Sequence, residues 1–173
     1  STNQGLGKAR VQGINAASNE IIAFQDADDK SHPTRLQKQL EFLDAHPESN
    51  LVGTQIQYFS KDGLIPGAPK HACLTWKEFN EKPSSWFVNS PTICMRKEAA
   101  IKAGNYNPEH VSMIEDLDFL IRFLKTHKRV DNLEETLYQY RIHPTQLTWQ
   151  GGKEGGEYWS KKRKELIDSY LDS

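Results

Sequence analysis

The feature that most constrains the fold is a short apolar run, residues 21–24, followed at once by Asp26, Asp28 and Asp29. Four consecutive apolar residues before a turn predict a strand buried on both faces, as in parallel sheets covered by helices. Such a strand presents the acids at its carboxyl end, where open α/β sheets bind ligands. Crowded carboxylates repel one another unless a cation lies between them, and oxygen ligands suit Mg²⁺, Mn²⁺ or Ca²⁺. The pattern favours a metal site, with a solvated turn before a helix as the alternative.

A calcium loop of the EF-hand type is excluded by its spacing. Counted from Asp26, the sixth position is Ser31 where such loops need glycine, and the twelfth is Gln37 where they need a bidentate Glu.

Composition excludes several classes of function. The 173 residues carry a formal net charge of −1, and the chain has no long basic stripe to neutralise phosphates, which argues against nucleic-acid binding. The basic cluster 161–164 lies in an amphipathic segment, so it indicates a solvated helix face, with a peripheral contact to anionic lipid as the alternative. Cys73 and Cys94 form no CxxC pair, and we expect a cytoplasmic protein, at most peripheral to the inner face of the membrane.

Helical and extended patterns alternate along the chain, as in an α/β domain. Helices are predicted over residues 6–17, 33–45, 98–103, 114–124 and 158–171. Strands are predicted over 52–58, 130–133 and 137–141, with extended segments at 86–88 and 92–95.

Two details of this pattern bear on the fold. Leu36, Leu40 and Leu43 recur at helical spacing, and polar residues alternate with apolar ones over 52–58, which predicts a half-buried strand. Residues 61–83 are rich in Gly and Pro, so we expect either a lid over a substrate or a disordered segment.

Several short motifs recur in a recognisable order along residues 3–148. The first group is Asn3-Gln4-Gly5, Ala9-Arg10, residues 20–24, Asp26-Ala27-Asp28-Asp29, Pro33 and Arg35-Leu36. The second group is residues 89–92, Gly104-Asn105-Tyr106, residues 115–118 and Tyr140-Arg141-Ile142-His143. Together they resemble family 2 of the inverting glycosyltransferases, which have the GT-A fold, a Rossmann-like mixed α/β sheet flanked by helices. A single motif of this kind is not specific, whereas the ordered series is.

The resemblance implies transfer of a sugar from a nucleotide-diphosphate donor to an acceptor hydroxyl, with inversion and with Mn²⁺ or Mg²⁺ as cofactor. The triplet Asp26-Ala27-Asp28 corresponds to the family's DxD motif, in which Asp28 and Asp26 would be metal ligands. His143 corresponds to a third ligand that some members supply. The diphosphate leaving group gains negative charge as the glycosidic bond breaks, and a bridging cation stabilises that charge.

Further roles follow from the same resemblance. Asp116 corresponds to the general base of the family's ED motif, and Glu115 would orient the acceptor or Asp116. Nucleotide-sugar-binding positions are matched by Asn3, Lys8, Arg10, Asp26 and Ala27. Acceptor-binding positions are matched by Trp86 and Asn89, although Trp86 is equally consistent with a core residue.

Two departures from the family pattern stand out. Val11 follows Arg10 where an asparagine is common. Family members also begin with a strand and a nucleotide-contacting loop that have no counterpart here, so the resemblance implies a truncated catalytic domain over residues 1–150, followed by a linker and helix over 151–173. An unpaired strand edge is a liability, and it predicts self-association.

Partners follow from these assignments. We expect a nucleotide-sugar donor, with UDP as the nucleotide that the resemblance implies, and a carbohydrate or lipid-linked acceptor in polysaccharide or cell-envelope biosynthesis. The alternative is a non-catalytic module of the same fold that binds a sugar nucleotide or carbohydrate. A second acid at Asp116 favours the enzyme, because binding alone does not require it.

Overall fold

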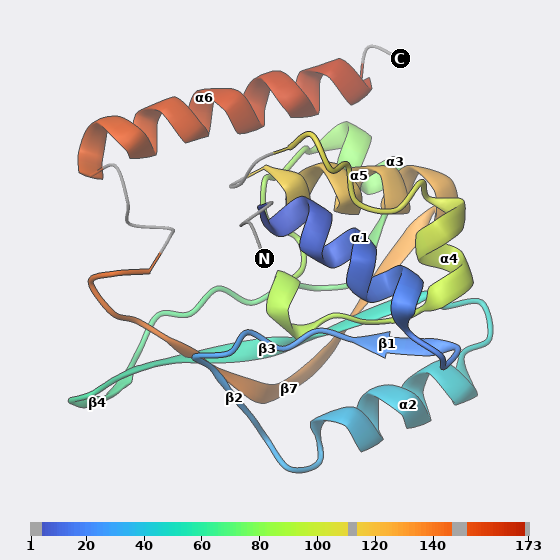
Figure 1. Ribbon diagram of the computed structural model, residues 1–173, viewed down its shortest axis with the longest axis horizontal. Coiled ribbons are helices and arrows are strands. Elements are labelled where there is room, and N and C mark those ends of the chain that lie inside the picture. The colour runs from blue at the N-terminus through green and yellow to red at the C-terminus, as the bar shows by residue number, and fades with distance from the viewer. Residues whose placement is uncertain (1–4, 111–113, 147–151, 172–173) are drawn as a thin grey trace.

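The computed structural model describes residues 5–110, 114–146 and 152–171 as a mixed sheet with helices on both faces (Figure 1). One face is covered by α2, and the other by α1, α4 and α5, with α6 lying beyond α5. The helices are α1 (Leu6–Ala16), α2 (Arg35–Ala45), α3 (Trp76–Glu81), the 3₁₀ helix η1 (Ser90–Thr92), α4 (Lys97–Lys102), α5 (Glu115–His127) and α6 (Gly152–Leu171). The strands are β1 (Ile21–Ala23), β2 (Lys30–Ser31), β3 (Leu51–Ser60), β4 (Gly63–Ile65), β5 (Leu74–Thr75), β6 (Cys94–Arg96) and β7 (Arg129–Arg141). The α/β GT-A architecture implied by the resemblance agrees with this arrangement.

The sheet is built around the parallel pair β3 and β7. The strand order is β1-β6-β3-β7-β2, and β1, β6 and β2 each pair antiparallel with their neighbours. Most of β3 is buried, so the expectation of a half-buried strand there is wrong: strands flank it on both sides and helices cover both faces. Its polar Gln55 is buried because its amide nitrogen donates to the carbonyls of His71 and Leu133, each at 2.8 Å.

The short strand β1 lies at one end of this order instead of inside the sheet. Ile21 and Ile22 are half-buried and Ala23 is exposed, so the predicted burial on both faces is wrong. Among the described strands β1 pairs only with β6, and residues of β1, β6 and α2 line a hollow of about 620 Å³. The hollow is lined by Ser18, Asn19, Glu20, Ile21, Ala23, Leu36, Leu40 and Cys94. Self-association through this edge stays a prediction.

Helix α2 turns an unexpected face to the sheet. Leu43 is buried, but Leu36 and Leu40 are 47% and 41% exposed, and the polar Arg35 and Gln39 are buried in their place. The Gln39 amide nitrogen donates to the carbonyls of Val52 and Thr92, each at 2.8 Å. The leucine spacing identified the helix correctly but not its buried face, because backbone carbonyls beneath α2 require donors.

The loop-rich segment 61–83 is anchored to the sheet. β4 pairs with β3, β5 pairs with β7, and α3 begins with a capping box formed by Thr75 and Glu78. The Asn132 amide also donates to the Ala72 carbonyl at 2.9 Å. The segment is therefore anchored to the sheet at several points, so the expectation of disorder is wrong, whereas a role as a lid over a substrate stays a prediction.

The C-terminal half contains longer elements than the sequence predicted. β7 runs unbroken from Arg129 to Arg141, and its register against β3 shifts near Thr54 and Gln55, which explains why the pattern indicated two strands. α6 already begins at Gly152, within the glycine-rich stretch that was expected to be a linker.

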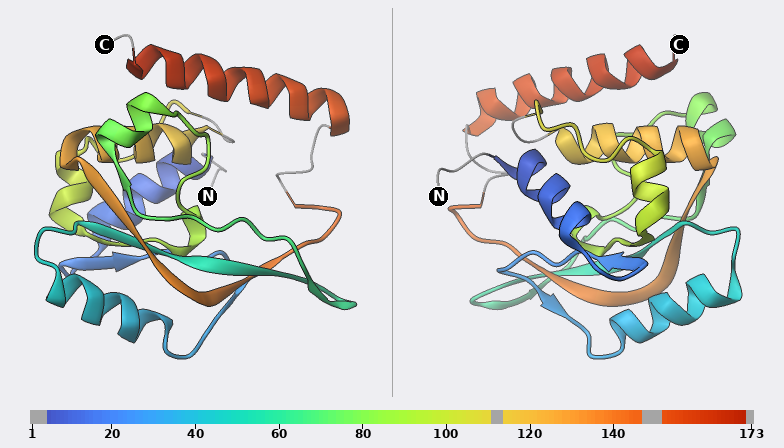
Figure 2. Two further views of the ribbon diagram at one scale, coloured as in Figure 1. Left: turned by 180° about the vertical axis from the view of Figure 1, so that it is seen from behind. Right: turned by 45° about the vertical axis from the view of Figure 1, so that its right-hand side comes forward.

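α6 packs on the helical layer of the domain, as both views in Figure 2 show. Ile167 is buried there, and the Tyr170 hydroxyl donates to the Asp118 carboxylate at 2.6 Å. Lys161, Lys162 and Lys164 pair with Glu165 and Asp168 on the same helix, in agreement with a solvated helix face. No helix in the described ranges combines the length and the apolar composition needed to cross a membrane.

Gly53 provides a test of the sheet's packing. A Cβ atom at this position would lie 2.6 Å from the Asn132 Oδ1 atom and would also collide with a Val88 methyl group. We expect Gly53→Ala to lower the free energy of unfolding by about 1–3 kcal/mol, because overpacking a buried strand displaces its neighbours. Urea denaturation measures this.

Gly13 in α1 supplies the matched control. It has no atom within 4 Å of the added Cβ, so Gly13→Ala should stabilise the protein by about 0.5–1 kcal/mol through helix propensity. Equal urea midpoints for the Gly53→Ala variant and the wild type would show that the packing of Gly53 against Asn132 and Val88 is not as tight as described.

Candidate active site

The acidic turn after β1 is fastened to β7. The Asp29 N–H donates to the Asp26 carbonyl at 3.3 Å and closes the turn. The Asp26 N–H donates to the Tyr138 hydroxyl at 3.1 Å, and the Asp29 Oδ1 atom accepts the Arg141 N–H at 2.7 Å. These bonds hold the three acids close together despite their mutual repulsion. Asp29 thus anchors the turn, whereas the N-cap of α2 is Thr34.

Asp28 and His143 meet across the site. The His143 Nε2 atom lies 2.9 Å from the Asp28 Oδ2 atom, and the Asp28 side chain is 50% exposed. The Arg141 Nε–H donates to the Asp28 carbonyl at 2.6 Å, which fixes the backbone between them. Residues separated by more than a hundred positions therefore present a carboxylate and an imidazole side by side, as the resemblance implied.

Burial makes the negative charge of this turn costly. It raises the pKa of Asp26, while Arg10 opposes that shift and Asp28 and Asp116 add to it. Burial also raises the pKa of Asp29 to about 6, although the hydrogen bond from Arg141 acts in the opposite direction. A bound cation would relieve this accumulation of charge.

Asp116 lies in the first turn of α5, where the helix dipole favours an anion. Its Oδ2 atom accepts the Ser90 hydroxyl at 2.9 Å, and its Oδ1 atom accepts the Leu117 N–H at 2.8 Å. The side chain is half-buried, so the carboxylate is held in place and still accessible.

Glu115 is buried behind Asp116. It is 3% exposed, and its Oε1 atom lies 3.2 Å from the Arg10 Nη1 atom, while the Oε2 atom has no hydrogen-bond partner in the described part of the chain. Burial and the neighbouring Asp116 charge raise its pKa, and Arg10 opposes them. Of the two predicted roles of Glu115, this burial favours orienting Asp116 over contacting an acceptor.

Arg10 joins α1 to α5 inside the site. Its guanidinium lies 5.1 Å from the centre of the Tyr106 ring, in addition to the ion pair with Glu115. Burial opposes its charge, but Tyr106, Asp116 and Glu115 raise its pKa above the ordinary value. The predicted contact between Arg10 and a nucleotide stays a prediction; the contact that the structure contains is internal.

The other predicted site residues differ in placement. Lys8 and Ala27 are exposed, and Asn3 lies outside the described residues. Trp86 is 48% exposed, which rules out a core role, and the Arg163 guanidinium of α6 lies 5.4 Å from its ring centre. Asn89 is buried, and its amide donates to the Thr54 carbonyl at 3.0 Å, so this residue joins η1 to β3, and its contact with an acceptor stays a prediction.

Arg35 belongs to the motif series, but the sequence pattern assigned it no role. It is 2% exposed, and its guanidinium donates to the Phe24 carbonyl at 2.9 Å and to the Pro91 carbonyl at 3.2 Å. It also lies 5.1 Å from the centre of the Tyr138 ring. The end of β1 and the start of η1 are thereby tied together. The only sequence signal was the motif around Pro33, which indicated a helix start.

Asp28 and His143 together fit part of a metal site. In the ranges that the structure describes, no three His, Cys, Asp or Glu side chains are grouped so as to hold a metal ion by themselves. Mg²⁺ is usually bound by one or two carboxylates together with substrate phosphates and water. Two protein donors at the edge of an acidic turn therefore fit a cation that also takes oxygen atoms from a diphosphate.

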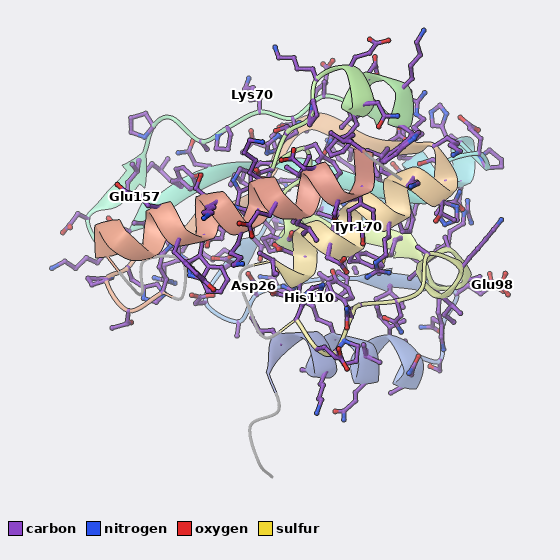
Figure 3. All side chains as sticks on the ribbon, turned by 90° about the horizontal axis from the view of Figure 1, so that it is seen from above. Asp26, Lys70, Glu98, His110, Glu157 and Tyr170 are labelled. Atoms are coloured by element: carbon purple, nitrogen blue, oxygen red, sulfur yellow. The ribbon has the colours of Figure 1, made fainter. Side chains whose placement is uncertain are left out.

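The acids form one site at the edge of the sheet. The charges of Asp28 and Asp116 both raise the pKa of Asp26, and in the view of Figure 3 Asp26 falls near the start of α5, on the side crossed by α6. This brings a candidate cation ligand set and a candidate base together.

Comparisons with known proteins agree with this geometry. The family model described as Glycosyl transferase family 2 matches residues 1–104. The putative glycosyltransferase EpsE of Bacillus subtilis is 31% identical over 146 residues, covering 81% of this chain and 50% of EpsE. The amylovoran biosynthesis glycosyltransferase AmsE of Erwinia amylovora is 29% identical over 141 residues, covering 80% of this chain and 51% of AmsE. The chain spans about half the length of the curated relatives it matches.

Solved structures show the same fold. TarS 1-349 from S. aureus in complex with UDP superimposes with a TM-score of 0.70 at 20% identity, covering 98% of this chain and 46% of the TarS chain. The complex of TarS 1-349 with UDP-GlcNAc gives a TM-score of 0.71 at 17% identity, covering 98% and 48%. The fold and the family model together define the class, a transferase domain of the GT-A type. The chain belongs to glycosyl transferase family 2.

The Arg10–Glu115 pair yields a prediction about stability. We expect Arg10→Met to lower the free energy of unfolding by about 3–5 kcal/mol at pH 7, because it leaves a buried carboxylate unpaired. The pKa of Glu115 is raised in the folded state, so the folded protein binds this proton more tightly than the unfolded chain does. The resulting stabilisation is present below the ordinary pKa of Glu and is lost as the pH rises through the raised pKa. The loss should therefore be smaller at pH 4.5 than at pH 7, as measured by urea denaturation.

The double variant Arg10→Met/Glu115→Gln is the control. Without an ionisable group at residue 115 its stability should differ less between the two pH values than that of Arg10→Met. If Arg10→Met lowered the free energy of unfolding by the same amount at both pH values, the result would contradict the buried ion pair.

Proposed function

We propose that this chain forms the catalytic core of a metal-dependent inverting glycosyltransferase. The donor is a nucleotide-diphosphate sugar, with UDP as the nucleotide, and the acceptor is a hydroxyl group of a growing polysaccharide or lipid-linked glycan. The observation that carries the proposal is the placement of Asp116, held through both carboxylate oxygens, in the same site as the Asp28–His143 pair.

The donor side of the mechanism uses the acidic turn. Asp28 and His143 would hold Mn²⁺ or Mg²⁺, and Asp26 lies close enough to contribute charge to the same cation. When bound, the cation supplies positive charge to the departing diphosphate, which gains negative charge as the glycosidic bond breaks. Tyr138 and Arg141 keep the turn rigid, so little reorganisation is needed during the reaction.

The acceptor side uses Asp116. Its carboxylate takes the proton of the acceptor hydroxyl while the oxygen forms a bond to the anomeric carbon and the bond to the diphosphate breaks. Inversion requires the base and the leaving group on opposite faces of the sugar. Asp116 belongs to α5 and the acidic turn follows β1, so two separate elements can approach the sugar from different sides.

The relatives support the choice of substrates. TarS has been crystallised with UDP and with UDP-GlcNAc. A galactosyltransferase of Escherichia coli, 22% identical over 154 residues, is named for UDP-Gal and a diphosphoundecaprenol-linked acceptor. AmsE is named for amylovoran biosynthesis. A lipid-linked acceptor would bring the protein to a membrane surface.

The donor site is tested by calorimetric titration of UDP with and without Mn²⁺. We expect Mn²⁺ to strengthen binding and Asp28→Asn to weaken it at least tenfold, because a carboxylate ligand of the cation is lost. Asp62→Asn, in the exposed turn between β3 and β4, is the matched control and should bind as the wild type does. Binding that ignores both Mn²⁺ and the Asp28→Asn change would overturn the metal assignment.

The base is tested by turnover. Asp116→Asn should lower kcat by about 10²–10⁴-fold, the usual contribution of a general base, and leave the affinity for UDP unchanged. Initial rates with a panel of UDP-sugars and acceptor glycans give kcat. A wild type that binds UDP with Mn²⁺ but transfers no sugar to any acceptor would favour the binding-module alternative.

A further inference from the structure

Ser90 contacts the proposed base although nothing in the sequence pattern assigns it a role. Its hydroxyl donates to the Asp116 Oδ2 atom at 2.9 Å, across 26 positions of the chain. The residue is half-buried, so the contact lies at the surface of the site.

The backbone around Ser90 is held by hydrogen bonds from α2, from β3 and within residues 89–92. The Pro91 carbonyl accepts the Arg35 guanidinium at 3.2 Å, and the same guanidinium reaches the Phe24 carbonyl beside the acidic turn. The Thr92 hydroxyl donates to the Asn89 carbonyl at 2.7 Å and accepts the Thr54 N–H at 3.0 Å. Ser90 therefore has a fixed position relative to both β1 and β3.

A carboxylate at a helix N-terminus can rotate about two side-chain torsions unless both oxygens have partners. In Asp116 the Leu117 N–H holds one oxygen and the Ser90 hydroxyl holds the other. A base must lie within hydrogen-bond distance of the proton that it accepts, and a misplacement of about 1 Å can reduce the rate about a hundredfold.

We propose that Ser90 is a positioning residue for sugar transfer: its hydroxyl fixes the orientation of the Asp116 carboxylate relative to the acidic turn, through the backbone that Arg35 ties to β1. The inference rests on the proposed function, because it takes Asp116 to be the base. It adds a requirement that the base alone does not impose, namely a hydroxyl group at residue 90.

The first test compares Ser90→Ala, Ser90→Thr and Ser84→Ala in the intact protein. Ser84 is an exposed serine of the same segment whose hydroxyl donates to a backbone carbonyl, so Ser84→Ala is the matched control. We expect Ser90→Ala to lower kcat about tenfold to a hundredfold, with UDP affinity in the presence of Mn²⁺ unchanged. Ser90→Thr should restore most of the rate, because it retains the hydroxyl.

A second measurement does not depend on turnover. The carboxyl-carbon NMR signal of Asp116, assigned by its loss in Asp116→Asn, should move in Ser90→Ala and return toward its wild-type position in Ser90→Thr. It should stay in place in Ser84→Ala. An unchanged signal in Ser90→Ala would overturn the inference, since the hydroxyl would then not engage the carboxylate.

The outcomes separate this inference from the function on which it rests. Full activity in Ser90→Ala together with a strong loss in Asp116→Asn would overturn the role of Ser90 and leave the base intact. Full activity in Asp116→Asn would instead refute the proposed base. A loss in UDP affinity in Ser90→Ala would also overturn the inference, because Ser90 would then act on the donor.

Discussion

The site depends on the attachment of a repulsive acidic turn to the end of β7. Asp26, Asp28 and Asp29 lie within four residues, and burial raises the pKa of two of them. The turn is held by the backbone of Arg141 and the hydroxyl of Tyr138, both from β7. Because β7 pairs in parallel with β3, its carboxyl end reaches this edge of the sheet and brings His143 beside Asp28.

Two arginines, the buried Arg35 and the half-buried Arg10, extend this arrangement to the proposed base. Arg35 joins the end of β1 to η1, and Arg10 joins α1 to Glu115 at the start of α5. Each guanidinium also lies over a tyrosine ring, which suits a planar, delocalised cation in a partly desolvated position. The proposed donor ligands and the proposed base thus come from separate elements that are connected by direct contacts, an arrangement that suits the proposed transfer between two bound substrates.

Much of the architecture was predictable from local patterns. Helices α2, α4 and α5 and strand β3 have clear periodicity or capping signals, and the order of the motifs along the sequence is by itself typical of the family. The candidate acids Asp26, Asp28 and Asp116 were also evident, because they fall at motif positions of the family; by themselves, acids in a turn or in a first helical turn are common. Their convergence in one site was implied only through the family resemblance.

The local patterns did not predict which side chains are buried or which distant groups they contact. Leu36 and Leu40 look like core residues, yet Arg35 and Gln39 occupy the buried face because they satisfy backbone carbonyls beneath α2. β1 looks like an interior strand, yet it lies at the end of the described strand order. These outcomes depend on which distant backbone groups face each element.

The sequence by itself determined the chemical types at the site and the elements that carry them: an acidic turn after a strand, an acid pair opening a helix and a histidine after a strand. Only the tertiary structure decided that Arg10 pairs with Glu115, that Asn89 bonds to the Thr54 carbonyl, that Ser90 contacts Asp116 and that Arg35 reaches the Pro91 carbonyl. Periodicity reports on local geometry, whereas hydrogen bonds between residues 26 to 113 positions apart arise only when the sheet and helices pack.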